Sequence, residues 1–306
     1  MAIFNFINEN IFSHVLRFFM TIFNGNFAAA IFMFTLIINL ALIPLTVKSQ
    51  KSSMQQLKIK PKLDAIKEKY GDDKQKYNAA MQELYAREKV SMSGGCLPMI
   101  LRLVLLMSIY YLVLSPIVYL ANVDSETIKA AAKELGNIKI DGNLRLELDV
   151  ISAIKAEGPA AGSNAAKIFS AVKGMDFNFF GIDLLSKPQF ALNLEAVRLN
   201  WIIPFLSFAA AMFGSILSIR TQKKANPGGP NMTGMMLFMP VISLIIAFSA
   251  PCGLGFYWAC SSFISAIIQE GVQYYYGPAK LLAKERAKGL IGRYEVEKKS
   301  IDSVKE

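Results

Sequence analysis

The chain has 306 residues, of which 53% are hydrophobic and 18% are charged, and its formal net charge is +10. The hydrophobic residues are gathered into four long runs without charged residues. These runs contain thirty residues between Arg17 and Lys48, twenty-one between Arg102 and Asp124, twenty-one between Arg198 and Arg220, and forty-five between Lys224 and Glu270. Because about 20 apolar residues suffice for one helical membrane span, these runs exclude a soluble globular enzyme, a disordered chain and a nucleic-acid-binding domain.

Residues 1–26 are predicted to form a helix that lies at the membrane interface. Apolar side chains recur at steps of three and four residues along this segment, from Phe4 to Ile22, and Asn24-Gly25-Asn26 provides a turn at its end. The segment has no basic region ahead of its apolar part and no cleavage site, which disfavours a cleaved signal peptide. The only histidine, His14, lies here, and we assign it no chemistry.

The predicted fold is an all-α polytopic membrane protein with five transmembrane helices. The predicted spans are residues 27–47, 97–121, 200–219, 234–250 and 254–269. The segments between and after them are predicted as a cytoplasmic helical hairpin (48–93), a small extracytoplasmic cap (122–199), a cytoplasmic loop (220–233) and a basic cytoplasmic tail (270–306). The fourth and fifth spans would each be only about 25 Å long, which predicts local thinning of the bilayer.

The distribution of basic residues predicts the orientation. Residues 48–93, 220–233 and 271–306 contain eleven, three and eight Lys and Arg residues, whereas the other side has Arg17 and nine more in the cap. The positive-inside rule then places the N-terminus outside and the C-terminus in the cytoplasm of a bacterial plasma membrane.

Two charged helices are predicted in the hairpin, over residues 49–70 and 74–89. Gly71 ends the first, and the aspartates that follow supply an N-cap for the second. In the cap, helices are predicted over residues 125–135 and 164–173 because each stretch ends at a glycine. The hairpin is either a positively charged topogenic loop or a docking arm for a nascent chain, a ribosome or lipid headgroups.

Arg102 is the charged residue that the predicted spans leave within the membrane. It lies about 8 Å into the second span, where it either extends back to the inner headgroups or lines a polar recess in the inner leaflet. Asn39, about 12 Å from the cytoplasmic end of the first span, lies at a depth that lets the two side chains meet. Further hydroxyls for such a recess come from Ser108, Ser207 and Ser262, although serines in spans more often pack helices together.

Four segments, in this order, resemble the YidC/Oxa-type membrane protein insertases. They are residues 34–46 (FTLIINLALIPLT), residues 94–100 (GGCLPMI), residues 177–184 (FNFFGIDL), and residues 253–258 (GLGFYW) followed by Ser262. The resemblance covers most of residues 27–270 and corresponds to the short bacterial form without a large outer domain.

The resemblance implies a five-helix bundle with a hydrophilic groove that is open to the cytoplasm and to lipid. The groove receives the polar tail of a nascent membrane protein while the apolar helix of that protein slides along the third and fifth spans. Where the family usually has Arg in the first span and often Gln in the second, this chain has Asn39 and Arg102, and Ser262 stands where Asn is common. We infer from this departure that Arg102 takes over the electrostatic role in the groove.

The residues expected in contact with the substrate form two sets. The groove set is Arg102, Asn39, Ser108, Ser207 and Ser262, and the slide set is Phe205, Phe208, Met212, Phe256, Trp258 and Phe263. The ribosome and the Sec translocase are partners implied by the resemblance, together with nascent membrane proteins and lipids. No cofactor, metal, small-molecule substrate or specific nucleic-acid sequence is expected.

Two other functions fit the sequence less well. A small-solute transporter or channel is the main alternative, but it would need repeated halves and broken helices around a midplane site, and the chain has no internal repeat. An intramembrane hydrolase would need His, Asp or Lys within the spans, which contain none of these residues. The cysteines, Cys96, Cys252 and Cys260, have no metal-binding spacing. We therefore expect no enzymatic activity.

Overall fold

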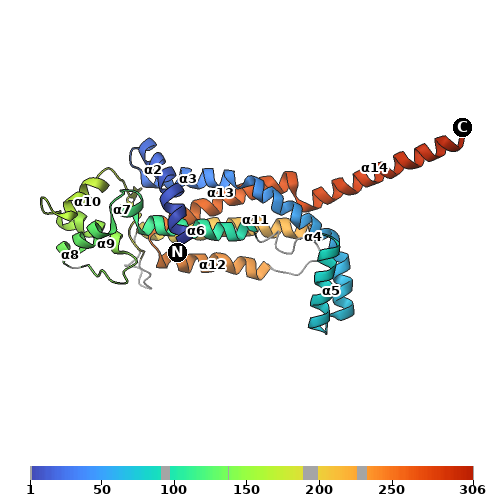
Figure 1. Ribbon diagram of the computed structural model, residues 1–306, viewed down its shortest axis with the longest axis horizontal. Helices are drawn as coiled ribbons and strands as arrows, with labels where there is room; N and C mark the ends of the chain where they lie inside the picture. Colours follow the sequence, from blue (N-terminus) through green and yellow to red (C-terminus); the bar gives the residue numbers. More distant parts are fainter. Residues whose placement is uncertain (1, 91–96, 137, 189–198, 226–232, 306) are drawn as a thin grey trace. The chain divides into compact units, whose positions relative to one another are not determined.

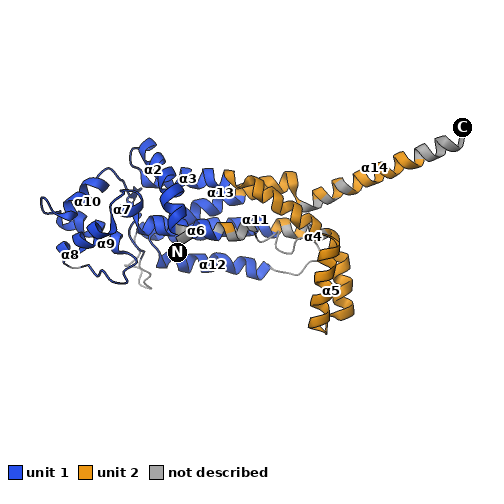
Figure 2. Cartoon of the chain, viewed as in Figure 1, with its two compact units in different colours: residues 1–40, 102–219, 230–266 blue, residues 41–101, 220–229, 267–306 orange. Residues whose placement is uncertain are grey.

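The structure is a computed structural model, and it describes residues 2–90, 97–136, 138–188, 199–225 and 233–305. Within these ranges the chain is helical apart from one short β-hairpin and the connecting loops (Figure 1). It divides into two compact units (Figure 2). Unit 1 contains residues 1–40, 102–219 and 230–266, and unit 2 contains residues 41–101, 220–229 and 267–306.

The N-terminal segment of unit 1 forms α1 (Ala2–Ile7), a turn of π-helix (Asn8–Phe12) and α2 (Ser13–Ile22). One face of this segment is buried against α3 (Phe27–Ala41), where the ring of Phe12 lies 5.2 Å from that of Phe34. The opposite face exposes Phe18 and Ile22. The position of this segment at the membrane interface, which would cover this apolar face with lipid, stays a prediction.

The turn between α2 and α3 requires a glycine. Gly25 has φ of +83°, and a Cβ at this position would lie 1.8 Å from the carbonyl oxygen of Gly174. Backbone hydrogen bonds join the turn to the cap, from Phe27 N to Asp176 O at 2.9 Å and from Asp176 N to Gly25 O at 2.8 Å. The side chain of Asn26 accepts a hydrogen bond from Ala29 N and so caps the start of α3.

The predicted first span is broken. α3 ends at Ala41, α4 (Ile43–Tyr70) begins after Leu42, and the two helices meet at a bend of 44°. Pro44 explains the break, because a proline ring conflicts with the carbonyl four residues earlier. The predicted second span is broken in the same way, into α6 (Leu97–Leu114) and α7 (Pro116–Tyr119).

Three further helices follow the cap: α11 (Ile202–Ala225), which a 3₁₀ turn (Leu199–Trp201) precedes, α12 (Thr233–Ser249) and α13 (Cys252–Tyr276). Among the described residues, Leu199–Thr221 and Cys252–Tyr276 are long and apolar enough to cross a membrane, and the bent pair α3 and α4 makes a third candidate. α12 and the described part of α6 are apolar but shorter. The described part of the chain therefore fits an all-α membrane protein, with two or three candidate spans by length and composition.

The helix that contains the predicted fifth span is longer than that span. The predicted span has 16 residues, whereas α13 has 25 residues and extends to Tyr276, which corresponds to about 37 Å of helix. Glu270 and Gln273 lie within its final turns, and such polar residues hide the continuation of a helix when spans are defined by runs of apolar residues.

In unit 2, α4 and α5 (Lys74–Arg87) are separated by the short segment 71–73 (Figure 1). The carboxylate of Asp73 accepts hydrogen bonds from the backbone N–H groups of Gln75 and Lys76, which confirms the predicted N-cap. An ion pair of 2.6 Å joins Lys62 of α4 to Glu88, the residue that follows α5. The last helix, α14 (Pro278–Lys305), packs against α4.

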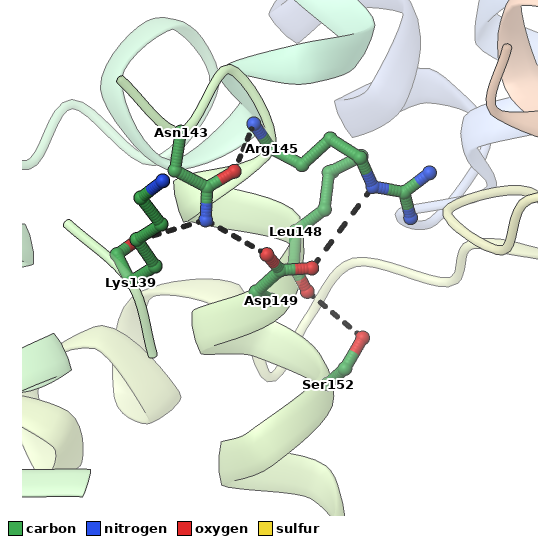
Figure 3. A network of polar contacts seen from close by, with 6 residues as sticks. All are labelled: Lys139, Asn143, Arg145, Leu148, Asp149 and Ser152. Carbon is green, nitrogen blue, oxygen red and sulfur yellow. Dashed lines mark hydrogen bonds and ion pairs between the residues drawn. The ribbon is translucent and has the colours of Figure 1, made fainter. Parts of the chain in front are cut away.

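The cap contains three short helices, α8 (Ser125–Leu135), α9 (Leu146–Glu157) and α10 (Asn164–Val172), which pack on one another. The helices predicted over 125–135 and 164–173 are confirmed. The helix α9 was not predicted. A hydrogen-bonded network orders the loop before it, in which Asn143 contacts Lys139, Arg145 and Asp149 (Figure 3).

The cap is also tied to the bundle helices of unit 1. It ends in a two-stranded antiparallel hairpin, β1 (Asn178–Phe179) and β2 (Ile182–Asp183). The carbonyl groups of Leu184 and Ser186, which follow β2, accept hydrogen bonds of 2.7 and 2.8 Å from the N–H groups of Gly253 and Cys252. The cap therefore satisfies two of the N–H groups that every helix leaves free in its first turn, here at the start of α13.

Glu147 makes a second tie between the cap and the bundle. Its side chain is buried, and one carboxylate oxygen accepts hydrogen bonds from Ile117 N at 2.6 Å and Val118 N at 3.1 Å, at the start of α7. Burial raises the pKa of this carboxyl group from 4.5 to about 7, against the opposing effect of the two backbone N–H groups.

We expect Glu147 to make the stability of the cap depend on pH. Its pKa is higher in the folded state, so the unfolded state loses its proton first and stability falls as the pH rises from about 4.5 to about 7, by on the order of 3 kcal/mol. Glu147→Gln keeps an oxygen acceptor but no charge, and it should remove this slope. Thermal unfolding in nanodiscs across this pH range would measure the effect. An unchanged slope in the variant would contradict the assignment.

Candidate functional site

Asn39 lies on α3 and makes a hydrogen bond between helices. Its amide nitrogen donates to the carbonyl of Thr35 at 2.8 Å, within its own helix. Its amide oxygen accepts a hydrogen bond of 2.7 Å from the hydroxyl of Ser265 on α13. Asn39 is half-buried and Ser265 is 8% exposed. Residues 39 and 265 belong to the same unit, and their hydrogen bond joins two predominantly apolar helices.

Ser265 is a site residue that the sequence analysis missed. The signal was present, because Ser265 lies three residues after Ser262 and four after Ser261, and residues at these spacings share one face of a helix. The three hydroxyls form a polar stripe on α13, and all three residues are half-buried or buried. Ser262 thus belongs to the same helix face as the partner of Asn39.

Arg102 lies within α6, but its side chain is outside the described residues. Its meeting with Asn39 therefore remains a prediction. Ser108 lies further along α6 and is fully buried, and its carbonyl accepts a hydrogen bond of 3.0 Å from the amide of Asn8. Among the described residues, the Ser108 hydroxyl and the Asn8 amide oxygen have no hydrogen-bond partner. The contacts of Ser108 thus fix the N-terminal segment to α6.

Ser207 packs α11 against α13. It is fully buried, and its hydroxyl donates a hydrogen bond of 2.6 Å to the carbonyl of Gly255. A Cβ at position 255 would lie 2.8 Å from a side-chain carbon of Ile203, and one at Gly214 would lie 3.4 Å from Ala266. Small residues therefore bring these two helices together, as is common between membrane helices. Ser207 therefore packs two helices together and does not line an open surface.

The predicted slide residues differ in their exposure. Phe205 and Phe263 are each 49% exposed, whereas Phe208, Met212 and Trp258 are half-buried. Phe263 lies beside Phe213, with ring centroids 5.8 Å apart, so α11 and α13 share an aromatic surface. These residues are accessible to a neighbouring apolar helix.

Phe256 does not fit the predicted slide. It is only 6% exposed, and its ring centroid lies 4.6 Å from that of Phe179 in the cap hairpin. The prediction that Phe256 faces a sliding substrate is therefore corrected, and the residue packs the hairpin onto α13.

A search for metal ligands within the described ranges finds no group of three or more His, Cys, Asp and Glu side chains. Cys252 is buried at the start of α13, and Cys260 is half-buried in the same helix. Cys96 lies outside the described residues. The described polar side chains around Asn39 are its own amide and the hydroxyls of the α13 serines.

The family model described as "60Kd inner membrane protein" matches residues 18–278. The chain belongs to this family, which is the YidC/Oxa family. The matched range includes both partners of the Asn39–Ser265 hydrogen bond and all the predicted spans. The resemblance drawn from four short segments of the sequence is thereby confirmed.

Several members of the YidC/Oxa family are similar to this chain, and each is named "Membrane protein insertase YidC". The protein of Fusobacterium nucleatum is 26% identical over 246 residues, which cover 80% of this chain and 85% of the relative. That of Brucella melitensis is 26% identical over 271 residues, or 89% of this chain and 36% of the relative. That of Pseudoalteromonas atlantica is 42% identical over 94 residues, or 30% of this chain and 17% of the relative.

The coverage differs among these relatives. The matched part is about a third of the Brucella protein but most of the Fusobacterium protein. The names of these relatives do not favour the small-solute transporter that the sequence left as an alternative.

We expect Asn39 and Ser265 to stabilise the bundle as a coupled pair. Asn39→Ala and Ser265→Ala should each lower the thermal unfolding midpoint in nanodiscs, by an amount that corresponds to about 0.6 kcal/mol, and the double variant should lose little more than the larger single loss. Ser249→Ala is the matched control, because Ser249 donates to Ile245 within its own helix and its effect should add to that of Asn39→Ala. Additive losses for Asn39→Ala and Ser265→Ala would contradict the coupling.

Proposed function

We propose that this chain is a membrane protein insertase and chaperone. It receives the polar tails of nascent membrane proteins in a positively charged groove in the inner leaflet, and it releases their apolar helices to lipid. The observation that supports this most directly is the hydrogen bond between Asn39 and Ser265 within an apolar bundle. Membership of the YidC/Oxa family and the names of the relatives support the same function.

The proposed topology has five spans, with the N-terminus outside and the C-terminus in the cytoplasm of a bacterial inner membrane. The spans are built on α3 with the start of α4, on α6 with α7, and on α11, α12 and α13. The remainder of α4 with α5 forms the cytoplasmic hairpin, and α8 to α10 with the β-hairpin form the outer cap. The basic residues in the hairpin and the tail support this orientation.

The groove is proposed to act through Arg102, Asn39 and the serines of α13. Because α6 carries Arg102 near its cytoplasmic end, the guanidinium group would be partly removed from bulk water. At a separation of 4 Å, the attraction between unit charges rises from about 1 kcal/mol in water to about 4 kcal/mol at an effective dielectric constant of 20. A carboxylate in the polar tail of a substrate would therefore be held there, while amide and hydroxyl groups satisfy the uncharged part of the tail.

The substrate's apolar helix is proposed to leave along α11 and α13. Phe205 and Phe263 supply the exposed aromatic surface, with Phe208, Met212 and Trp258 beside it. Burial of about 20 apolar residues of the substrate in the bilayer provides the driving force, and the membrane potential assists outward movement of acidic tails. The reaction needs no bond cleavage, so we propose no enzymatic step and no cofactor.

The proposed function implies several partners for this chain. Nascent membrane proteins and membrane lipids are the direct partners of the groove and the slide. The ribosome and the Sec translocase are proposed as the machinery that delivers substrates, with the basic hairpin as a surface that an anionic partner would contact. Binding of the ribosome or the translocase can be measured independently of the action of the groove.

Arg102→Ala should impair insertion of substrates that have acidic outer tails. Loss of this attraction should lower insertion at least about tenfold in reconstituted proteoliposomes, measured by protease protection of the translocated tail, because about 1.4 kcal/mol already corresponds to a factor of ten. Control substrates have the acidic residues of the same tails replaced by Asn and Gln. They should insert equally well with the unmodified protein and with Arg102→Ala. The double variant Arg102→Gln with Asn39→Arg should restore insertion. Normal insertion of acidic tails by Arg102→Ala would overturn the electrostatic role.

A further inference from the structure

The end of α13 carries the features of a membrane–water boundary. Tyr274, Tyr275 and Tyr276 are consecutive and exposed, by 64%, 67% and 44%. Tyrosines gather at this boundary because their rings are apolar and their hydroxyls are polar. Lys280 lies over the ring of Tyr274, with its Nζ 4.0 Å from the centroid, and it donates a hydrogen bond of 2.6 Å to the Tyr274 carbonyl. Only Gly277 separates this end from α14, which begins at Pro278, so α14 starts next to the exposed tyrosines.

One face of α14 is an exposed apolar stripe. Leu290, Ile291 and Tyr294 are 65%, 58% and 67% exposed. At about 100° of rotation per residue they lie within about 100° of one another around the helix, together with Ala283 and Ala287. α14 packs against α4, and this contact leaves the stripe uncovered.

The positive charge of α14 is concentrated beside α13. Residues 280–293 contain five basic side chains and one acidic side chain, Glu285, whereas residues 294–306 contain three basic and four acidic side chains. The basic residues of the first half are Lys280, Lys284, Arg286, Lys288 and Arg293. Each Lys or Arg near an anionic leaflet contributes about 1 kcal/mol of attraction. The charge is therefore placed where a membrane surface would meet it.

We propose that α14 docks in the plane of the membrane, on a leaflet that contains anionic phospholipid. Leu290, Ile291 and Tyr294 enter the boundary between headgroups and acyl chains, and the basic residues of the first half contact lipid phosphates. An anionic lipid surface uses both the charge and the apolar stripe, whereas RNA would use only the charge. The proposal requires that α13 spans the membrane, and it does not depend on insertase activity.

Hydrogen exchange of the full chain in nanodiscs tests this docking. Backbone amides of residues 283–297 should exchange at least about tenfold more slowly in nanodiscs of phosphatidylcholine with phosphatidylglycerol than in phosphatidylcholine alone, because docking on the anionic surface suppresses local opening of the helix. The apolar stripe is tested with Leu290→Asn and Tyr294→Asn, each of which should remove the difference. Val296→Asn is the matched control, since Val296 is 68% exposed but lies on the opposite side of the helix, and it should keep the difference.

The charge is tested with a matched pair of triple variants. Replacement of Lys284, Arg286 and Lys288 by Gln should remove the protection, and replacement of Lys298, Lys299 and Lys305 by Gln should preserve it. Equal exchange in the two lipid mixtures would overturn the proposal, as would protection that appears only when ribosomes are added. Insertion activity measured on the same variants separates this result from the proposed function, because a loss of docking with normal insertion leaves the groove intact.

Discussion

A polar group inside a bilayer finds no water, so the protein must provide its partner, and this constraint explains the polar contacts between the bundle helices. Asn39 and Thr35 each donate to a carbonyl one turn earlier in α3, and the remaining oxygen of Asn39 receives the hydroxyl of Ser265. Ser207 donates to the carbonyl of Gly255 across the contact between α11 and α13. The bundle thus uses short polar side chains to join helices. The amide of Asn39 is the largest of these groups, and it is only half-buried.

The same constraint connects the cap to the bundle of unit 1. The first N–H groups of α7 are satisfied by the carboxylate of Glu147, and those at the start of α13 by carbonyls that follow the β-hairpin. Phe256 and Phe179 add an aromatic contact at the same end. The cap therefore supplies hydrogen-bond acceptors to the first N–H groups of α7 and α13. These hydrogen bonds account for the position of the cap in the fold without a catalytic role.

The class of the fold and the family could be predicted from the sequence, because long charge-free runs and the order of four short motifs can be recognised in one sequence alone. Helix boundaries were predicted where local chemistry decides them, as at Asp73, which caps α5, and at Gly136, which ends α8 with φ of +74°. The breaks at Leu42 and Ser115 were missed because hydropathy treated Pro44 and Pro116 as apolar residues, although a proline interrupts the helix before it.

Of the candidate site, Asn39 could be predicted as an amide in an apolar span, but its partner depends on which face of α13 meets α3. Neither periodicity nor spacing within one helix determines that face, and Ser262 was chosen where Ser265 makes the contact. Phe256 was misplaced for a related reason, since only the tertiary packing of the hairpin covers it.

The central claim is that the polar pair of α3 and α13 faces an incoming polypeptide. Photocrosslinking from positions 39 and 265, with ribosome-bound nascent membrane proteins as substrates, tests it most directly, and position 256 provides a buried control. The account predicts adducts from positions 39 and 265 that move along the nascent chain as it lengthens, and none from position 256. Adducts from elsewhere on the bundle, with none from positions 39 and 265, would contradict it.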